Sequence, residues 1–275
     1  MNKCMKNWNS CLIIGAIAGD IIGSVYEYHN VKTIDFDLFC DNSDFTDDSV
    51  LTLATMDAIL NKRNYAENYQ LFGRNYPNRD YGGNFYNWIY SDNPQPYNSW
   101  GNGSAMRVSP VGWCCNSIEE TMLEAKKSAE VTHNHPEGIK GAQAAASAVY
   151  MARAGRSKNE IREYIADTFK YDLDRKTDDI RPYYSFDVSC QGSVPEAIIA
   201  FLESSDYENA IRLAVSIGGD SDTIACITGG IAEAYYQKIP EYIVENVLSI
   251  LPERLIWIIE DFSEKYGKKE SASSR

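Results

Sequence analysis

Hydrophobic residues recur every three to four positions along most of the chain, which is the spacing of one face of an amphipathic helix. Capping residues mark several of the helix starts, among them Ser117, Ser157 and Asp206. Strands alternating with helices are absent from the pattern. The sequence therefore predicts an all-α fold, with helices over residues 10–27, 47–61, 118–131, 137–154, 158–169, 193–203, 206–217, 222–238, 240–249 and 254–265.

Two stretches interrupt this periodicity. Residues 62–113 are rich in Gly, Asn, Pro, Tyr and Trp, and residues 171–192 are polar. Long loops in compact domains are usually functional, so we interpret the first stretch as a Gly/Tyr/Trp-rich active-site loop region. Because no linker or repeat is evident, we predict a single compact, orthogonally packed helical domain over residues 1–265, followed by a flexible tail over residues 266–275.

The composition narrows the choice of partners. The 275 residues include 39 acidic and 26 basic side chains, a formal net charge of −13, so a nucleic-acid polymer is not expected as a partner. The apolar run over residues 11–19 ends at Asp20 and is far shorter than the roughly 20 residues that span a membrane. Seven cysteines without a CxxC pair are typical of buried, reduced thiols. We therefore expect a cytoplasmic monomer without a membrane partner.

Two acidic clusters far apart in the sequence carry the strongest chemical signal. Residues 46–48 (Thr-Asp-Asp) and 220–223 (Asp-Ser-Asp-Thr) each open a predicted helix, and each supplies two carboxylates and a threonine hydroxyl. Hard cations such as Mg²⁺ prefer these oxygen ligands, and four carboxylates suit two ions. The alternative interpretation is helix capping, because Thr46 and Asp220 are good N-cap residues and acids in a first turn complement the helix dipole. The presence of both clusters favours a dinuclear site.

The first predicted helix carries a stripe of glycines. Gly15, Gly19 and Gly23 recur every four residues and share one helix face, and Glu27 is the next position on it. Each glycine costs about 1 kcal/mol relative to alanine in a helix, so the stripe predicts another backbone passing close by. Metal-bound carboxylates have their lone pairs engaged, so Glu27 is the candidate general base, with Asp80 as the alternative. Taken alone, Glu27 would be an ordinary surface residue.

Glycine-rich turns and a histidine pair give weaker signals. The segment 99–107 contains Gly-Asn-Gly, whose backbone amides can turn towards an anion, beside Trp100, which could stack on a base. Residues 80–83 form a similar turn, and both segments are equally compatible with ordinary turns. His133 and His135 have no third His or Cys ligand nearby, so zinc is not expected. A phosphate contact or a helix cap is the better interpretation of this pair.

Five motifs stand in the order and spacing of a known enzyme family. They are GDIIGSVYE, FTDDS, GNGSAMRVSP, THNHPEGIKGA and IGGDSDT. Over residues 10–240 the chain resembles the ADP-ribosyl-glycohydrolase family, which includes dinitrogenase-reductase-activating glycohydrolase and the ADP-ribosyl-acceptor hydrolases. GSVYEYHN looks most like the ADP-ribosylserine hydrolase branch. The resemblance implies an all-α domain that hydrolyses the bond between ADP-ribose and an acceptor, with two Mg²⁺ ions as cofactors, or Mn²⁺ in some members.

The resemblance also implies roles for individual residues. Glu27 would be the catalytic carboxylate beside the metals, and Trp100 would stack on adenine. Pro94 stands near the position of that branch's second aromatic wall, where Tyr97 is a possible substitute. The metal ligands would be Thr46, Asp47, Asp48, Asp220, Asp222 and Thr223. The residues around the diphosphate and ribose would be Gly82, Gly83, Ser99, Gly101, Asn102, Gly103 and His133.

The acceptor stays open at this point. Arginine-linked ADP-ribose, serine-linked ADP-ribose and O-acetyl-ADP-ribose are all compatible with the motifs, so the expected partner is an ADP-ribosylated protein or a small ADP-ribose conjugate. Two other function classes also remain: a non-catalytic ADP-ribose-binding relative, and another metal-dependent hydrolase acting on a nucleotide. Glu27 and the two complete acidic clusters favour the glycohydrolase.

Overall fold

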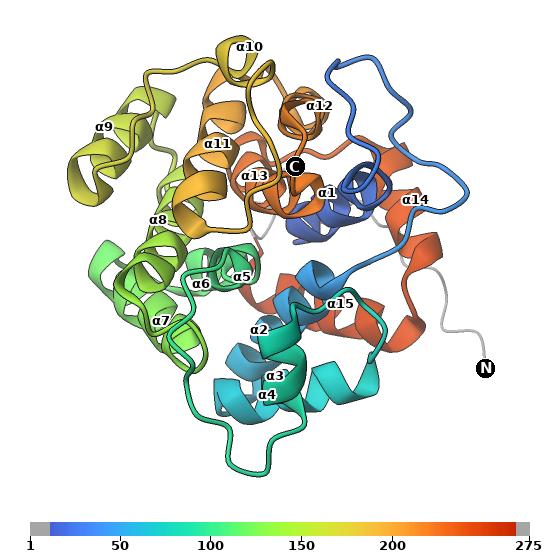
Figure 1. Ribbon diagram of the computed structural model, residues 1–275, viewed down its shortest axis with the longest axis vertical. Helices are drawn as coiled ribbons and strands as arrows, with labels where there is room; N and C mark the ends of the chain where they lie inside the picture. Colours follow the sequence, from blue (N-terminus) through green and yellow to red (C-terminus); the bar gives the residue numbers. More distant parts are fainter. Residues whose placement is uncertain (1–11, 268–275) are drawn as a thin grey trace, which may run out of the picture.

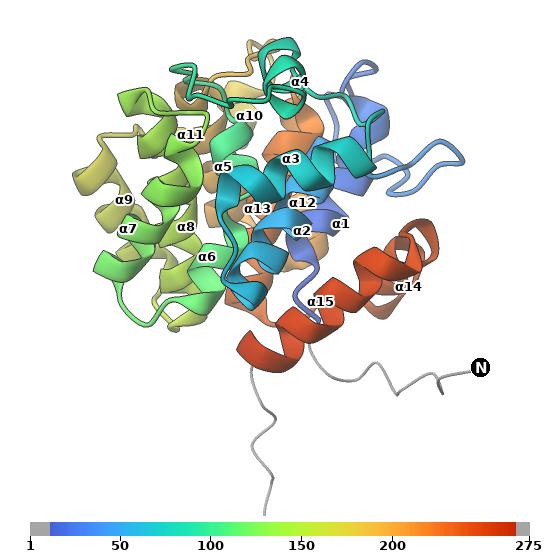
Figure 2. The same cartoon turned by 90° about the horizontal axis from the view of Figure 1, so that it is seen from below.

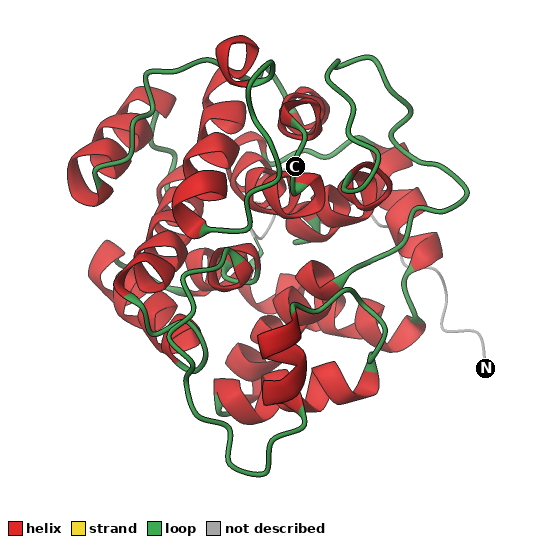
Figure 3. Cartoon of the chain, in the orientation of Figure 1, coloured by secondary structure: helices red, strands yellow, loops and turns green. Residues whose placement is uncertain are grey.

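The structure, a computed structural model that describes residues 12–267, consists of helices and loops with no β-strand in this range (Figures 1 and 3). An isolated antiparallel bridge joins Gly101 to Ser189. The all-α prediction is confirmed. The helical elements are α1 Gly15–Gly23, the 3₁₀ turn η1 Ser24–Tyr26, α2 Asp47–Asn61, α3 Tyr65–Asn75, α4 Gly83–Ile89, α5 Gly103–Met106, α6 Ser109–Cys114, α7 Ile118–Glu130, α8 Pro136–Arg153, α9 Lys158–Phe169, α10 Thr177–Ile180, α11 Cys190–Glu203, α12 Tyr207–Ile217, α13 Ser221–Tyr236, α14 Glu241–Ile250 and α15 Glu253–Tyr266.

The helices predicted from hydrophobic periodicity are present, and most begin within three residues of the expected position. Ser117, Ser157 and Asp206 are the N-caps of α7, α9 and α12, and each side chain accepts a hydrogen bond from a backbone amide of the first turn. The first helix is shorter than predicted, because it begins at Gly15 and gives way to a 3₁₀ turn after Gly23.

The stretch over residues 62–113 is not the loop region that its composition predicts, because it contains α3, α4, α5 and α6. Asn64 caps α3, and the rings of Tyr69 and Phe72 are buried along that helix. Helices α4, α5 and α6 have only seven, four and six residues, too few to display a helical period. The second interruption likewise contains α10, and α11 already begins at Cys190.

Helices α1 and α13 pack tightly against each other near the middle of the molecule (Figure 1). A Cβ on Gly19 would lie 2.1 Å from the carbonyl oxygen of Ala225, and a Cβ on Gly15 would lie 2.6 Å from that of Gly229. At Gly23 the same atom would meet the first turn of α13. The close backbone that the glycine stripe predicts is therefore α13, and the two helices run antiparallel, so the end of α1 meets the beginning of α13.

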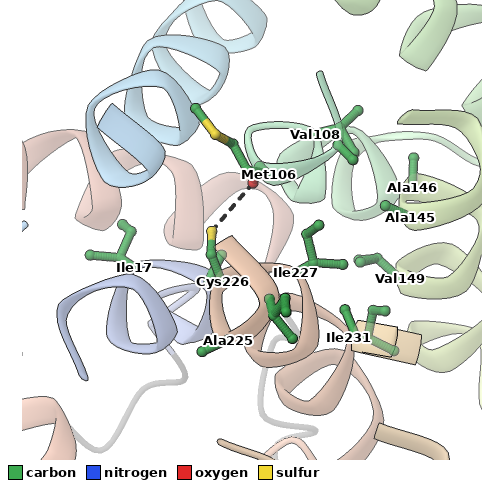
Figure 4. Close-up of a cluster of buried hydrophobic side chains, with 14 of the residues drawn as sticks. Ile17, Met106, Val108, Ala145, Ala146, Val149, Ala225, Cys226, Ile227 and Ile231 are labelled. Atoms are coloured by element: carbon green, nitrogen blue, oxygen red, sulfur yellow. Dashed lines mark hydrogen bonds between the residues drawn. The ribbon is translucent and has the colours of Figure 1, made fainter. Parts of the chain in front are cut away.

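Apolar side chains fill the space between these helices and their neighbours (Figure 4). Ile17, Val149 and Ile227 are buried there, and the thiol of Cys226 donates to the carbonyl of Met106 at 3.4 Å. Helices α14 and α15 lie on the side of the molecule away from α4 (Figure 2). Helix α15 packs on α2, which supports the helix that carries the first acidic cluster.

Three smaller expectations can be placed on the structure. Within the described part of the chain, no helix has both the length and the apolar character needed to cross a membrane. Three of the five described cysteines are buried, but Cys40 is exposed, contrary to the expectation of buried thiols. Helix α15 ends at Tyr266, where the predicted tail begins, and residues 268–275 of that tail lie outside the described range.

Candidate active site

The two acidic clusters line one cavity of about 400 Å³. The first cluster begins α2 and the second begins α13. A hydrogen bond joins them directly, from Oγ1 of Thr223 to Oδ2 of Asp48 at 3.1 Å. Asp47, Asp220 and Asp222 line the same cavity. Its volume is in the range of sites that hold small ligands.

A further buried carboxylate, Asp20 of α1, lies beside the clusters. It is fully buried and accepts hydrogen bonds from the backbone amides and the hydroxyls of both Thr46 and Ser49. Asp20 therefore holds the beginning of α2 against α1 and orients the Thr46 hydroxyl, whose oxygen accepts from the Asp48 amide at 3.3 Å. The sequence signal for this residue is a single acid within the apolar helix GAIAGDIIG.

Carboxylate oxygens in the cavity lie close enough together to hold metal ions. Oxygens of Asp20, Asp48 and Asp222 are within 4.8 Å of one another, and so are oxygens of Glu27, Asp220 and Asp222. Asp222 thus belongs to both groups. In the described part of the chain, Oδ1 of Asp48 is buried without a hydrogen-bond partner. The donor set is all oxygen, which is the chemistry that divalent hard cations prefer, so these residues fit such an ion.

Burial and mutual repulsion raise the pKa of these acids. Burial raises the pKa of Asp20 to about 6. The pKa of Asp48 and of Asp222 is raised well above its ordinary value, first by burial and then by the neighbouring carboxylates. Buried like charges are unfavourable unless positive charge offsets them. The cluster is therefore an energetically costly arrangement for a protein that holds no cation there.

The capping interpretation accounts for one cluster and not for the other. Thr46 is the N-cap of α2 and its side chain makes the capping hydrogen bond. Asp220 occupies the N-cap position of α13, but its side chain makes no capping hydrogen bond. Its Oδ2 accepts instead from the side-chain amide of Asn102 at 2.7 Å, and both residues line the cavity. Helix capping therefore does not explain why Asp220 is an aspartate.

Glu27 follows the 3₁₀ turn at the end of α1 and lines the same cavity. Burial and the charge of Asp220 raise the pKa of Glu27 to about 7. The side-chain amide of Asn30 donates to the carbonyl of Glu27 at 2.7 Å, and its Oδ1 accepts from the Gly219 amide at 2.6 Å. Asn30 therefore ties the Glu27 segment to the loop that precedes α13, which keeps Glu27 beside Asp220 and Asp222.

The Gly-Asn-Gly segment forms another wall of the cavity. Gly101 and Gly103 flank the imidazole of His133, and a Cβ on Gly103 would lie 3.1 Å from its Nε2. Side chains at these positions would therefore narrow the space in front of the imidazole. His135, in contrast, caps α8 through its Nδ1. The two interpretations of the histidine pair thus apply to different residues: His135 is a helix cap, and His133 faces the cavity.

The structure brings together all but two of the residues that the sequence assigns to the site. Thr46 points towards Asp20 and lines an adjoining hollow of about 330 Å³. Trp100 is 53% exposed, does not line the main cavity, and packs edge-on against His135 with 5.5 Å between ring centroids. The assigned residues that do line the main cavity are Glu27, Asp47, Asp48, Gly82, Gly83, Ser99, Gly101, Asn102, Gly103, His133, Asp220, Asp222 and Thr223.

Several other cavity residues had not been assigned from the sequence. Phe85 of α4 and Arg107, directly after α5, line the cavity, and so does Tyr97. Phe186 and Val188 reach it from the polar stretch before α11. No local pattern marks these residues, because their place in the cavity depends on how distant helices pack. The sequence marks Tyr97 only as a possible substitute for the second aromatic wall.

Comparisons with known proteins agree with this geometry. The family model described as ADP-ribosylglycohydrolase matches residues 11–272. ADP-ribosylhydrolase ARH3 of Mus musculus is 27% identical, in an alignment that covers 87% of this chain and 86% of the relative. The human protein of that name is 26% identical, with 87% and 88% coverage.

A viral relative and a solved structure extend the comparison. The putative ADP-ribosyl glycohydrolase L543 of Acanthamoeba polyphaga mimivirus is 26% identical, with coverage of 90% of this chain and 93% of the relative. A solved structure named ADP-ribosylglycohydrolase-related protein complex superposes with a TM-score of 0.66 over 93% of this chain and 98% of that chain. At 20% identity, that structure shows a shared fold. With the family model matching nearly the whole chain, this protein belongs to the ADP-ribosylglycohydrolase family of glycosyl hydrolases.

Proposed function

We propose that this enzyme is a Mg²⁺-dependent hydrolase that releases ADP-ribose from an ADP-ribosylated protein or a small ADP-ribose conjugate, with a dinuclear metal site and Glu27 as acid and base. The family hydrolyses ADP-ribose linkages. The observation that carries the finer proposal is that oxygens of Asp222 converge with those of Asp48 in one group of carboxylates and with those of Asp220 in another, and that Glu27, which is not a proposed ligand, has an oxygen within 4.8 Å of the second pair. A dinuclear centre and a proton-transferring group would thus share one cavity.

The proposed metal ligands provide oxygen donors only, which favours Mg²⁺, with Mn²⁺ as the second candidate. The unpartnered, buried Oδ1 of Asp48 supports this assignment, since a bound cation would give it a partner. The cations, when bound, supply the positive charge that orients the ribose hydroxyls and polarises an attacking water. The proposed ligands are Thr46, Asp47, Asp48, Asp220, Asp222 and Thr223.

Glu27 is the proposed acid and base. The bond that is cleaved is glycosidic, or an ester in a conjugate such as O-acetyl-ADP-ribose. In the glycosidic case the bond between ribose C1 and the acceptor breaks, a bond from C1 to a water oxygen forms, and one water proton passes to the acceptor. A carboxylate next to C1 can accept that proton from water and deliver it to the leaving acceptor. The raised pKa of about 7 allows Glu27 to exist in both protonation states near neutrality. Asp80 lines the same cavity and remains the alternative base.

The glycine-rich walls are the proposed site for the rest of ADP-ribose. Ser99 Oγ accepts from the Gly101 amide at 3.1 Å, which folds the backbone of this segment into a turn at the cavity wall. We assign the diphosphate and ribose to the walls formed by the residues predicted from the motifs. Trp100, exposed outside the main cavity, would stack on an adenine that extends beyond its mouth. The proposed binding residues are Gly82, Gly83, Ser99, Trp100, Gly101, Asn102, Gly103 and His133.

The experiment that tests the proposal measures ADP-ribose release from serine-ADP-ribosylated peptide, arginine-ADP-ribosylated peptide and O-acetyl-ADP-ribose. Each substrate is incubated with Mg²⁺, with Mn²⁺ and with a chelator. We expect release from at least one substrate with metal and loss of release with chelator. Glu27→Gln is expected to keep ADP-ribose binding and to lower turnover by roughly 10²–10⁴-fold.

Three outcomes would contradict the proposal. If no substrate released ADP-ribose, either with metal or with chelator, while the protein still bound ADP-ribose, the protein would be a non-catalytic binder. Release of inorganic phosphate from a nucleotide would indicate a different metal-dependent hydrolase. Near-normal turnover of Glu27→Gln would exclude Glu27 as the acid and base, and Asp80→Asn would then be the variant to compare.

A further inference from the structure

Arg107 is a fully buried arginine in the wall of the cavity. Its guanidinium lies over the ring of Tyr69, with 4.3 Å from Cζ to the ring centroid. The Nη2 group donates to the carbonyl of Ser128 at 3.0 Å and to Oγ1 of Thr132 at 2.9 Å. Because Nη2 carries two hydrogens and both have acceptors, this end of the guanidinium is held in one orientation.

The hydroxyl of Thr132 connects Arg107 to His133. Among the described residues, Oγ1 of Thr132 has two hydrogen-bond partners: Nη2 of Arg107 and Nδ1 of His133, the latter at 2.7 Å. A guanidinium donates and cannot accept, so the threonine hydrogen has Nδ1 as its available acceptor. Donation to Nδ1 is the arrangement that gives the threonine hydrogen an acceptor, and it places a lone pair on Nδ1 and the ring hydrogen on Nε2.

The environment of His133 favours the neutral ring. Burial and the positive charge of Arg107 lower the pKa of His133 well below its ordinary value. Its Nε2 faces Gly101 and Gly103, at which a Cβ would lie 3.6 Å and 3.1 Å from that atom. Because both positions are glycine, Nε2 and its hydrogen border the cavity without a side chain in front of them.

We propose that Arg107 and Thr132 are positioning residues that hold His133 in the tautomer with hydrogen on Nε2, so that the ring donates a hydrogen bond to a phosphate oxygen in the cavity. The identity of the ligand rests on the proposed function, whereas the tautomer rests on the hydrogen-bond chain alone. The opposite tautomer would present a nitrogen lone pair to the phosphate and repel it. An orientation fixed before binding spares the ligand the free energy of selecting the tautomer.

The tautomer can be measured directly in the free protein. The chain contains three histidines, His29, His133 and His135, so ¹⁵N-histidine NMR gives few signals. His29→Gln and His135→Gln assign them by elimination. We expect His133 near neutral pH to show an unprotonated Nδ1 and a protonated Nε2. A protonated Nδ1, whether in the neutral or the charged ring, would overturn the proposal irrespective of any activity.

Thr132→Val removes the hydroxyl at nearly constant volume and tests the middle of the chain. We expect the other His133 tautomer to become the major form and ADP-ribose binding by calorimetry to weaken about fivefold, because only the fraction with hydrogen on Nε2 binds the phosphate. Thr132→Ser restores the hydroxyl and should restore both properties. Thr121→Val is the matched control, because Thr121 is a buried threonine of α7 whose hydroxyl bonds within its own helix.

A double-mutant cycle separates positioning from general destabilisation. In a His133→Ala background, Thr132→Val should weaken ADP-ribose binding no further, because its effect passes through the imidazole. An equal loss in both backgrounds, or an equal loss for Thr121→Val, would overturn the positioning role. Arg107→Met should also allow His133 to populate the other tautomer. If Arg107→Met does not fold, the result for Thr132→Val decides the test. If the wild type shows the expected tautomer yet binds no ADP-ribose, the proposed function fails while the hydrogen-bond chain stands.

Discussion

Gly19 of α1 and Ala225 of α13 lie backbone to backbone, so that a Cβ on Gly19 would be 2.1 Å from the Ala225 carbonyl oxygen and 2.5 Å from its carbonyl carbon. Backbone atoms cannot move aside as the end of a flexible side chain can, so glycine is the residue that fits. Asp20 is the next residue of α1, and Asp222 lies in the first turn of α13. The packing of these two backbones therefore sets the spacing of the buried carboxylates.

Gly19→Ala is expected to lower stability and activity together. Overpacking of this kind costs about 3 kcal/mol at its upper range, or roughly 5 °C in Tm for a chain of this length. Because the helices must separate, the oxygens of Asp20 and Asp222 would also separate, and the response of Tm to Mg²⁺ should weaken. The measurement is thermal unfolding with chelator and with Mg²⁺.

Gly83→Ala is the control for the effect of Gly19→Ala on stability alone, because Gly83 belongs to the proposed binding site. Gly83 is also helical, but a Cβ there would have no atom within 4 Å. Its Tm should stay unchanged or rise slightly, because alanine is the better helix former. Equal stability of Gly19→Ala and the wild type would show that α1 and α13 can separate without loss, and would contradict the role assigned to their contact.

The glycine stripe and the acidic clusters could be predicted from the sequence because each is a local pattern with a physical cause. Glycines four residues apart lie on the same face of a helix, whatever that helix packs against. Pairs of carboxylates at two helix starts suggest a cation site even when the sequence does not show that the two starts lie close together in space. Trp100 is different, because the direction of its ring is set by its contact with His135, which belongs to another loop.

Arg107 and the short helices α4–α6 could not be predicted for related reasons, whereas α3 carries a recognisable signal in its Asn64 cap and its buried Tyr69 and Phe72. The short helices have too few turns to show a period, and aromatic residues with several glycines and asparagines also occur in loops. A lone arginine in a helical sequence is normally exposed, whereas Arg107 is buried because Tyr69 of α3 and Ser128 and Thr132 at the end of α7 surround it. Such a position follows from tertiary packing and leaves no local signal.

Asp222→Asn is expected to change stability in opposite directions with and without metal. With chelator, the variant should melt at a higher temperature than the wild type, because one member of a buried group of acids becomes neutral. With Mg²⁺, the wild type should gain up to about 2.7 kcal/mol at a hundredfold excess over Kd, and the variant should gain much less. The measurement is Tm against Mg²⁺ concentration.

The exposed Asp261 of α15 offers the matched control for this experiment. Asp261→Asn removes the same charge at a residue that does not line the cavity, so its Tm should respond to Mg²⁺ as fully as that of the wild type. An Asp222→Asn variant that gains as much from Mg²⁺ as the wild type would exclude Asp222 as the shared ligand. A variant that is less stable than the wild type in chelator would contradict the repulsion among the buried acids.

Asn30→Ala is expected to lower turnover with little effect on folding. The exposed Asn30 joins the carbonyl of Glu27 to the amide of Gly219, so its loss frees the Glu27 segment without opening the core. A misplacement of about 1 Å at a catalytic group can cost roughly 10²-fold in rate, so kcat should fall by about 10- to 100-fold. The measurement compares kcat with the Kd for ADP-ribose.

Thr33→Ala, at an exposed position in the same loop, should leave kcat near the wild-type value. The expected signature of Asn30→Ala is a fall in kcat with an ADP-ribose Kd within a few fold of the wild type, because Glu27 acts on the scissile bond. An unchanged kcat would show that Glu27 keeps its position without the Asn30 amide.

Glu233 gives the protein a pH dependence of stability that is separate from the cavity. Its carboxylate accepts from the backbone amides of Ile14 at 2.8 Å and Gly15 at 2.9 Å, at the beginning of α1. Full burial raises the pKa of Glu233 from 4.5 to about 8. The folded protein therefore holds this proton between about pH 4.5 and pH 8, whereas the unfolded chain releases it. The contribution of protonated Glu233 to stability is complete below the pKa that Glu233 has in the unfolded chain. It decreases above that pH and is lost as the pH rises through the pKa that Glu233 has in the folded protein.

Glu233→Gln tests this contribution, because glutamine cannot ionise. The wild type should lose stability relative to the variant as the pH rises from 5 to 8, by an amount on the order of 3 kcal/mol. The measurement is urea unfolding of both proteins at several pH values, with chelator present so that metal binding does not add its own pH dependence. Glutamine can accept from one of the two amides but faces the other with its own NH₂ group, so a constant offset between the proteins is expected as well. The test is how the difference in free energy of unfolding between the wild type and Glu233→Gln changes with pH. If this difference grew in favour of the wild type as the pH rises, the amides of Ile14 and Gly15 would stabilise the carboxylate more than burial disfavours it.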